Sequence, residues 1–204
     1  MKALLIKDFL TLSKMILTIV ILLLIFACIP QFNMSVFFMV YCTMLPVTAL
    51  GFDERTKWDT LAAMMPYRPQ EIVLGKYVLG YILLAVVTAL ALLAVCVVGL
   101  VTGAPAAPGI YLSGLLYAAA ATNVLAITLP LVYRFGVEKG RLAFGIGIGV
   151  GISLFIALVL PLMDNADMFM LTRGQLIALI LAFTVLLNLL SIRLSIQFYR
   201  RKLA

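Results

Sequence analysis

Histidine is absent from the 204 residues of this chain, and charged residues make up only 11% of them. Without histidine, the chain cannot use histidine-based acid–base catalysis or a histidine-ligated metal site. The three cysteines, Cys28, Cys42 and Cys96, stand in apolar runs without CxxC spacing, which is typical of packing residues. The composition therefore argues against the commonest metal and redox functions.

Apolar residues, by contrast, are unusually abundant. They make up 65% of the chain, and the mean hydropathy is +1.22. Soluble domains are about 45–50% apolar and about 25% charged. A soluble protein of this length could not hide so much apolar surface from water. The sequence therefore predicts an all-α, polytopic integral membrane protein.

Six hydrophobic runs approach the length of about 20 residues that a membrane-spanning helix needs. We interpret residues 1–204 as a single transmembrane domain whose spans are 15–29, 32–52, 77–101, 110–133, 142–163 and 175–197. An amphipathic interfacial helix over 1–14 is expected before the first span. A cytoplasmic loop over 53–76 separates the second span from the third, and an outer loop over 164–174 separates the last two.

The basic residues predict the orientation of the spans. With both termini in the cytoplasm, every lysine and arginine except Arg173 falls in or beside a cytoplasmic segment. Arg173 shares the outer side with Asp164 and Asp167. Because short cytoplasmic loops collect basic residues, this orientation is strongly favoured over its inverse. The net charge of +7 reflects this asymmetry, so we do not expect a nucleic-acid partner.

The segment 53–76 is longer than a simple connector and carries four basic and four acidic residues. Trp58, Leu61, Ala62 and Met65 are spaced to share one face of a short helix that ends at Pro66. Such a face could dock into a groove of a soluble partner. It could equally rest on the bilayer or on the ends of the protein's own helices, and the sequence leaves both interpretations open.

The predicted spans lack reactive groups. No aspartate or glutamate lies within them, which argues against proton-coupled transport and metal-dependent catalysis. Asn123 and Asn188 lie deep in the fourth and sixth spans, where we expect them to form hydrogen bonds between helices. The chain has no Walker A motif, because no glycine stands five residues before Gly75-Lys76. We therefore predict that the chain is not an enzyme and that any ATPase is a separate subunit.

The layout resembles the permease subunits of type-2 ATP-binding cassette (ABC) exporters, in particular a compact bacterial group of about 200 residues. The opening Leu5-Ile-Lys-Asp-Phe9 is similar to the family's amphipathic start. The loop resembles the family's first cytoplasmic loop in an acid pair, a tryptophan, a leucine, a residue before proline and a Lys-Tyr pair. These are Asp53-Glu54, Trp58, Leu61, Met65-Pro66 and Lys76-Tyr77, with Met65 where leucine is commoner.

The resemblance implies a function and two sets of site residues. Two permease copies, or one copy and a homologous permease, would enclose a pathway driven by two ATPase subunits that bind ATP and magnesium, with no cofactor in this chain. The candidates for the ATPase interface are Asp53, Glu54, Arg55, Trp58, Asp59 and Leu61. The candidates for the pathway are Phe37, Phe38, Tyr41, Met44, Gly147 and Gly151.

By the same analogy, we expect the protein to span the bacterial cytoplasmic membrane. It would export amphipathic peptides, including antimicrobial peptides, or lipophilic compounds. One alternative is the substrate-binding membrane subunit of an energy-coupling-factor importer, which has a similar length but needs no docking loop of this size. Another is a non-transport assembly factor or sensor partner, which would not respond to any ATPase.

Overall fold

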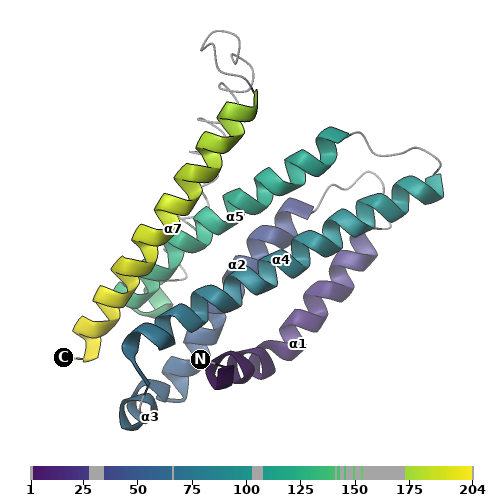
Figure 1. Ribbon diagram of the computed structural model, residues 1–204. Helices are drawn as coiled ribbons and strands as arrows, with labels where there is room; N and C mark the ends of the chain where they lie inside the picture. Colours follow the sequence, from purple (N-terminus) through teal and green to yellow (C-terminus); the bar gives the residue numbers. More distant parts are fainter. Residues whose placement is uncertain are drawn as a thin grey trace.

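The computed structural model describes residues 2–27, 35–65, 67–102, 108–140, 142, 145, 149, 153 and 173–203. In this part of the chain every regular element that has bounds is an α-helix (Figure 1). The helices are α1 (Lys2–Ala27), α2 (Ser35–Arg55), α3 (Trp58–Met64), α4 (Pro69–Thr102), α5 (Pro108–Phe135) and α7 (Arg173–Leu203). The all-α prediction is therefore confirmed for the described residues.

Four of these helices are long and apolar enough to cross a membrane: Ala3–Ile25, Pro69–Val101, Tyr111–Phe135 and Ile177–Arg201. They correspond to the predicted first, third, fourth and sixth spans. The helix α2 covers the predicted second span but is not among the four. The predicted fifth span, 142–163, and the outer loop, 164–174, fall almost wholly outside the described residues. The count of six spans therefore stays a prediction.

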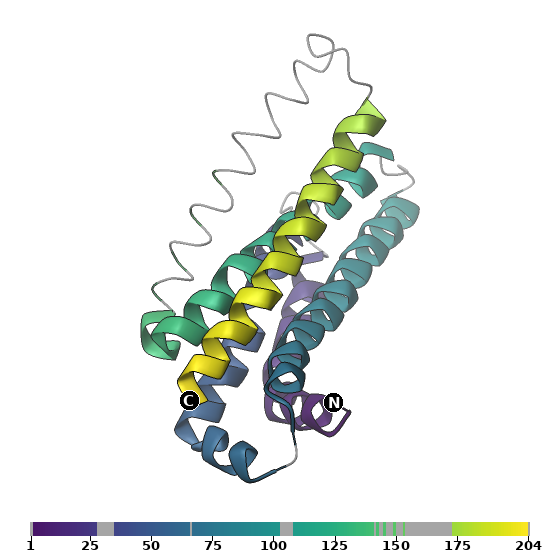
Figure 2. The ribbon, with the colours of Figure 1, turned by 60° about the vertical axis from the view of Figure 1, so that its left-hand side comes forward.

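The helix α1 joins the predicted interfacial segment and the first predicted span without a break. Its sequence contains neither proline nor glycine, so nothing in it stops the helix. In Figures 1 and 2 its first turns lie across one end of the bundle, and the later turns rise along the other helices. Leu4, Asp8 and Leu12 face the bundle and are buried, whereas Ile6 and Leu10 are exposed.

Both chain ends lie at this same end of the bundle (Figure 1). We call it the basal end; it comprises the start of α1, the end of α2, α3, the start of α4 and the ends of α5 and α7. Meeting of the two termini at one end is what an even number of spans would give. The side of the membrane that the basal end faces stays a prediction from the basic residues.

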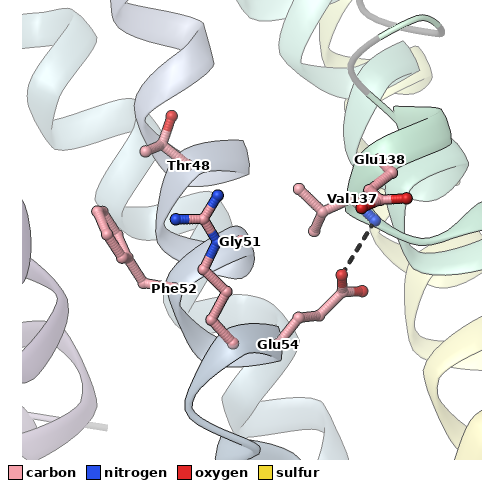
Figure 3. Close-up of a pocket in the computed structure, with 7 residues that line it drawn as sticks. Thr48, Gly51, Phe52, Glu54, Val137 and Glu138 are labelled. Carbon is pink, nitrogen blue, oxygen red and sulfur yellow. Dashed lines mark hydrogen bonds between the residues drawn. The ribbon is translucent and has the colours of Figure 1, made fainter.

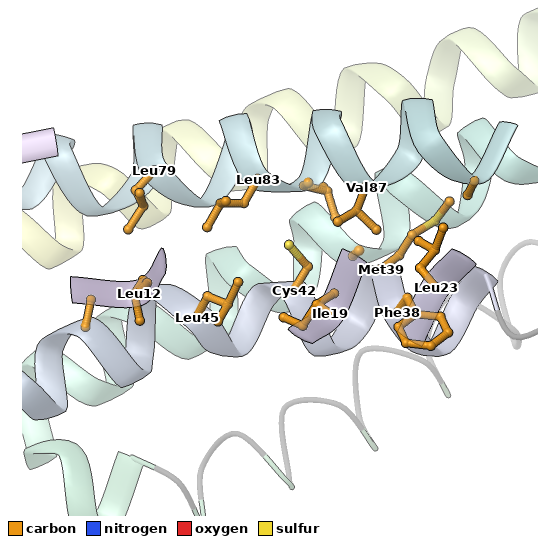
Figure 4. Packing of buried hydrophobic residues seen from close by; sticks show 14 residues of the cluster. Leu12, Ile19, Leu23, Phe38, Met39, Cys42, Leu45, Leu79, Leu83 and Val87 are labelled. Carbon is orange, nitrogen blue, oxygen red and sulfur yellow. The ribbon is translucent and has the colours of Figure 1, made fainter. Parts of the chain in front are cut away.

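The long helix α4 is the centre of the bundle and packs against α1, α2, α5 and α7. On one side it forms an apolar core with α1 and α2 (Figure 4). Leu12 and Ile19 of α1, Leu45 of α2, and Leu79 and Leu83 of α4 are buried in this core. On its other side, α4 shares a second core with α5 and α7.

Hydrogen bonds between polar side chains reinforce the second core. The hydroxyl of Tyr77 on α4 lies 2.6 Å from Ser191 Oγ and 2.8 Å from Ser195 Oγ on α7. Tyr81 donates to Asn188 Oδ1 at 2.8 Å, and Asn123 Nδ2 donates to Thr184 Oγ1 at 3.3 Å. Both asparagines thus form the interhelical contacts expected of them, although Asn123 Oδ1 is buried without a hydrogen-bond partner among the described residues.

Much of the outer surface of the bundle is apolar. Leu93 and Leu100 on α4 and Phe183 and Leu186 on α7 all have more than half of their surface exposed. A protein dissolved in water rarely exposes apolar surface on this scale. A hydrocarbon environment accepts it, and helices satisfy their own backbone groups there. The arrangement agrees with a membrane protein whose core is formed between α4 and its neighbours.

Gly80 allows a close approach between α4, α2 and α5. A Cβ atom at this position would lie 2.9 Å from Leu125 Cδ2 and 3.1 Å from Pro46 Cγ. We expect Gly80→Ala to lower the free energy of unfolding by about 1–3 kcal/mol, because the Pro46 ring cannot move aside as freely as a leucine methyl group. Thermal unfolding in detergent micelles measures the change.

Gly75→Ala is the matched control for this substitution. A Cβ atom at Gly75 would have nothing within 4 Å, although Gly75 lies on the same helix. Alanine also favours the helix by about 1 kcal/mol over glycine. We therefore expect Gly75→Ala to leave the stability unchanged or to raise it. Equal loss of stability in the two variants would contradict the close approach at Gly80.

Candidate functional site

Four charged side chains at the basal end form a closed ring of alternating sign. Lys76 Nζ lies 2.7 Å from Asp8 Oδ2 and 2.6 Å from Asp53 Oδ2. Lys7 Nζ lies 2.5 Å from Asp53 Oδ1 and 3.2 Å from Asp8 Oδ1. We call Lys7, Asp8, Lys76 and Asp53 the charge ring. It joins α1, α2 and α4, which contribute two, one and one of its members.

Burial of the charge ring carries a cost in free energy. The side chains of Lys76 and Asp8 are only 3% and 4% exposed, and that of Asp53 is 13% exposed. Removing a charge from water costs several kcal/mol, which only good pairing offsets. Each carboxylate in the ring contacts two ammonium groups, and each ammonium group contacts two carboxylates. The ring is therefore electrically neutral and can form only when α1, α2 and α4 meet.

The local sequence explains why these side chains converge. Asp8 shares the inner face of α1 with Leu4 and Leu12, so packing of that face turns the carboxylate inwards. Lys76 stands between the buried residues Val73 and Leu79 on α4. Asp53 lies in the last turn of α2, where the helix dipole disfavours a carboxylate. The two lysines offset this unfavourable position.

The short helix α3 lies at the basal end, between the end of α2 and the start of α4 (Figures 1 and 2). It follows Lys57, whose backbone adopts the left-handed conformation (φ 50°, ψ 39°) that non-glycine residues seldom adopt. This conformation turns the chain sharply between α2 and α3. Lys7 Nζ lies 4.1 Å from the centre of the Trp58 ring, a cation–π contact that attaches α3 to the charge ring.

The face predicted for α3 is divided in the structure. Trp58 is half-buried and Ala62 is buried, and both pack on the core shared by α4, α5 and α7. Leu61 is 48% exposed, and Met64, which the predicted face did not include, is 84% exposed. One face of α3 therefore rests on the protein itself, and a second, apolar face is open.

The remaining interface candidates lie at or beside the end of α2. Asp53 belongs to the charge ring and faces inwards, whereas Arg55 is exposed. Glu54 is exposed, and one of its carboxylate oxygens accepts a hydrogen bond from the backbone N–H of Val137 at 3.3 Å. Asp59 lies in α3, but its side chain is outside the described part of the structure.

The pathway candidates separate onto two faces of α2. Phe37 is 60% exposed and stacks on Tyr41, with 6.2 Å between ring centroids, and Met44 is half-buried further along this face. Phe38 is only 4% exposed and packs in the core with Leu23 and Met39 (Figure 4). Gly147 and Gly151 lie outside the described residues.

A pocket of about 180 Å³ opens between the last two turns of α2 and the turn that follows α5. It is lined by Thr48, Gly51, Phe52, Glu54, Arg55, Val137 and Glu138. In Figure 3, Glu54 reaches from α2 across to the backbone of Val137. Gly136 shapes the turn, because its backbone (φ +83°) is accessible to glycine but costly for other residues.

Comparison with known proteins accords with this architecture. The family model described as "ABC-2 family transporter protein" matches residues 3–200, which is nearly the whole chain. The chain belongs to the ABC-2 transporter family. No match was found among curated proteins or solved structures.

As an ABC-2 permease, this chain is a membrane component of an ABC transporter and is not itself catalytic. The family implies a separate ABC ATPase as a partner and a membrane as the location. The sequence resemblance is thereby confirmed at the level of the family. It named Asp53 and Trp58 as interface candidates, whereas their partners Lys7, Asp8 and Lys76 stood in its motifs without an assigned role.

One sequence signal pointed to a role for Asp8. Asp8 is the only acidic residue before Asp53, and it stands in an apolar helix. A lone carboxylate in such a setting needs a cationic partner. What the sequence did not reveal is that Lys76, 68 residues away, supplies it.

The charge ring of the ABC-2 permease predicts how single and double substitutions of Asp8 and Lys76 change the free energy of unfolding. Lys76→Met should leave an uncompensated negative charge and lower the free energy of unfolding by about 3–5 kcal/mol. The double variant Asp8→Leu/Lys76→Met removes one charge of each sign and leaves the Lys7–Asp53 pair intact. It should recover most of the loss, as measured by thermal unfolding in micelles.

The single variant Asp8→Leu completes this double-mutant cycle. If the effects of Asp8→Leu and Lys76→Met simply add in the double variant, the two side chains do not interact and the ring is not a unit.

Proposed function

We propose that this permease works as an exporter in which an ATPase subunit docks on the open face of α3 and drives a pathway formed by two permease copies. The observation that carries the proposal is the division of α3 into an attached face and an open apolar face. A solvent-exposed methionine and leucine on a seven-residue helix are costly unless a partner or the membrane surface covers them.

The interface in this proposal centres on Leu61 and Met64, with Arg55 at its rim and Asp59 of α3 as a further candidate. Apolar anchors surrounded by charged groups are the usual pattern of a protein interface. Asp53 and Trp58 belong to the same unit but act from behind, because they connect α3 to the charge ring. Glu54 completes the site through its contact with the turn after α5.

The charge ring supports a route by which movement of α3 reaches the membrane helices. Trp58 lies against Lys7, and Lys7 belongs to α1. Asp53 and Lys76 extend the same ring to α2 and α4. When the ATPases close around ATP and magnesium, a push on α3 would therefore move α1, α2 and α4 together as a rigid body.

The exposed face of α2 is the part of the pathway that we propose from described residues. Phe37, Tyr41 and Met44 follow one another along this face at helical spacing. Phe38 would support the pathway wall from behind, and Gly147 and Gly151 would allow close packing of the predicted fifth span. An aromatic, apolar wall suits amphipathic peptides or lipophilic compounds, and antimicrobial peptides belong to the first class.

We place the basal end in the cytoplasm of a bacterial cell, in accord with the basic residues gathered there. A second copy of this chain, or a homologous permease, would complete the pathway. Outward transport follows in this proposal from the family resemblance and from the ATPase site on the cytoplasmic side.

The open face of α3 gives a direct test. Leu61→Asp/Met64→Asp should weaken ATPase association by roughly 30-fold or more, because two charges would face the apolar anchors of the partner. The measurement is the amount of ATPase that co-purifies with the tagged permease from its native membrane in nanodiscs, quantified by mass spectrometry.

Gln70→Asp is the control, because it adds a negative charge to an exposed position at the basal end, outside α3. It should retain the ATPase. Recovery of the ATPase at the wild-type ratio with the double aspartate variant would show that α3 is not its docking site.

A further inference from the structure

The pocket at the foot of α2 continues the exposed aromatic face of that helix. Phe37, Tyr41, Thr48 and Phe52 are spaced by four, seven and four residues, which places them on one side of α2. Thr48 and Phe52 then line the pocket itself. An elongated molecule lying along this face would therefore reach the pocket with one end.

The pocket has an excess of negative charge. Glu54 and Glu138 line it together with Arg55, so its three ionisable side chains carry a formal net charge of −1. Within the described residues, neither Glu138 nor Arg55 belongs to an ion pair. An anionic group would meet two carboxylates here, whereas a cationic group would be attracted.

A buried hydroxyl beside the pocket also lacks a hydrogen-bond partner in the described part of the chain. Tyr133 is 8% exposed, and its hydroxyl forms no hydrogen bond with any described residue. It lines a cavity of about 20 Å³ that adjoins the pocket, because Glu54 and Val137 line both. This cavity is large enough for one small polar group. The oxygen of Tyr133 can accept a hydrogen bond from an N–H donor there.

We propose that this pocket binds the ammonium group of a lysine side chain of an amphipathic peptide cargo whose apolar side lies on the Phe37–Tyr41 face of α2. Glu138 and Glu54 receive the charge, Phe52 packs on the aliphatic stem, and the Tyr133 hydroxyl accepts a hydrogen bond at the inner end. The inference rests on the proposed export function and names its cargo more closely: a cationic amphipathic peptide.

The test uses the permease in phosphatidylcholine nanodiscs together with the ATPase that co-purifies with it. Two probes carry a neutral fluorophore: a helical peptide of leucine and lysine, and the same peptide with every lysine replaced by glutamine. Binding to empty nanodiscs is subtracted. The wild-type permease should bind the lysine peptide more tightly than the glutamine peptide.

Substitutions in the pocket should remove this preference selectively. Glu138→Gln should weaken binding of the lysine peptide about fivefold to tenfold, since a charged hydrogen bond becomes a neutral one. It should leave the glutamine peptide unaffected. Tyr133→Phe removes a hydroxyl that has no hydrogen-bond partner among the described residues, and it should also weaken only the lysine peptide.

Glu71→Gln is the matched control, because it makes the same change of charge on the first turn of α4, outside the pocket. It should leave both affinities unchanged. Equal binding of the two peptides by the wild-type permease, or equal weakening of both by Glu138→Gln, would overturn the proposal.

The two experiments distinguish failure of the lysine subsite from failure of the proposed export function. Loss of the ATPase on Leu61→Asp/Met64→Asp together with charge-independent peptide binding would leave the exporter in place and remove the lysine subsite. Charge-dependent peptide binding by a permease that never co-purifies with an ATPase would remove the exporter and leave the subsite.

Discussion

The charge ring of Lys7, Asp8, Asp53 and Lys76 is the interaction on which the basal end depends. Asp8, Asp53 and Lys76 are largely buried, and their charges are tolerable only because each contacts two partners of opposite sign. The cost of breaking the ring keeps α1, α2 and α4 in register. The same ring contacts Trp58 through Lys7, and this contact together with packing of Trp58 and Ala62 on the second core holds α3 in place.

This arrangement separates the membrane part of the permease from its exposed surface. Above the ring, apolar packing between α1, α2 and α4 and hydrogen bonds between α4, α5 and α7 hold the bundle together. Below it, α3 offers Leu61 and Met64 to the surroundings. The two levels are connected by the contact between Lys7 of the ring and Trp58, and by packing of Trp58 and Ala62 on the second core.

The helix α2 illustrates how one element serves two environments. Phe38, Cys42 and Leu45 face the core with α1 and α4, whereas Phe37 and Tyr41 face outwards. Its last turn then divides again: Asp53 points into the charge ring, and Glu54 reaches the turn after α5. Neighbouring residues on a helix point about 100° apart, so adjacent positions acquire different roles.

The sequence by itself determined the solvent and the class of the protein. Composition indicated a membrane, run lengths located four segments that form helices long and apolar enough to cross it, and the motifs of the loop identified the family. Asn123 and Asn188 were correctly predicted to join helices, since a polar amide in hydrocarbon must find a partner on a neighbouring helix. These conclusions depend on hydropathy and local spacing, which a sequence displays directly.

Only the tertiary structure decided which faces of the helices meet. It turned Trp58 and Asp53 inwards, left Leu61 open and separated Phe38 from Phe37. It also joined Asp8 to Lys76 across 68 residues. The physical reason is that any carboxylate can pair with any lysine that folding brings near it, so the sequence does not say which two will pair. Their meeting depends on how α1 and α4 pack, which local pattern and hydropathy do not specify.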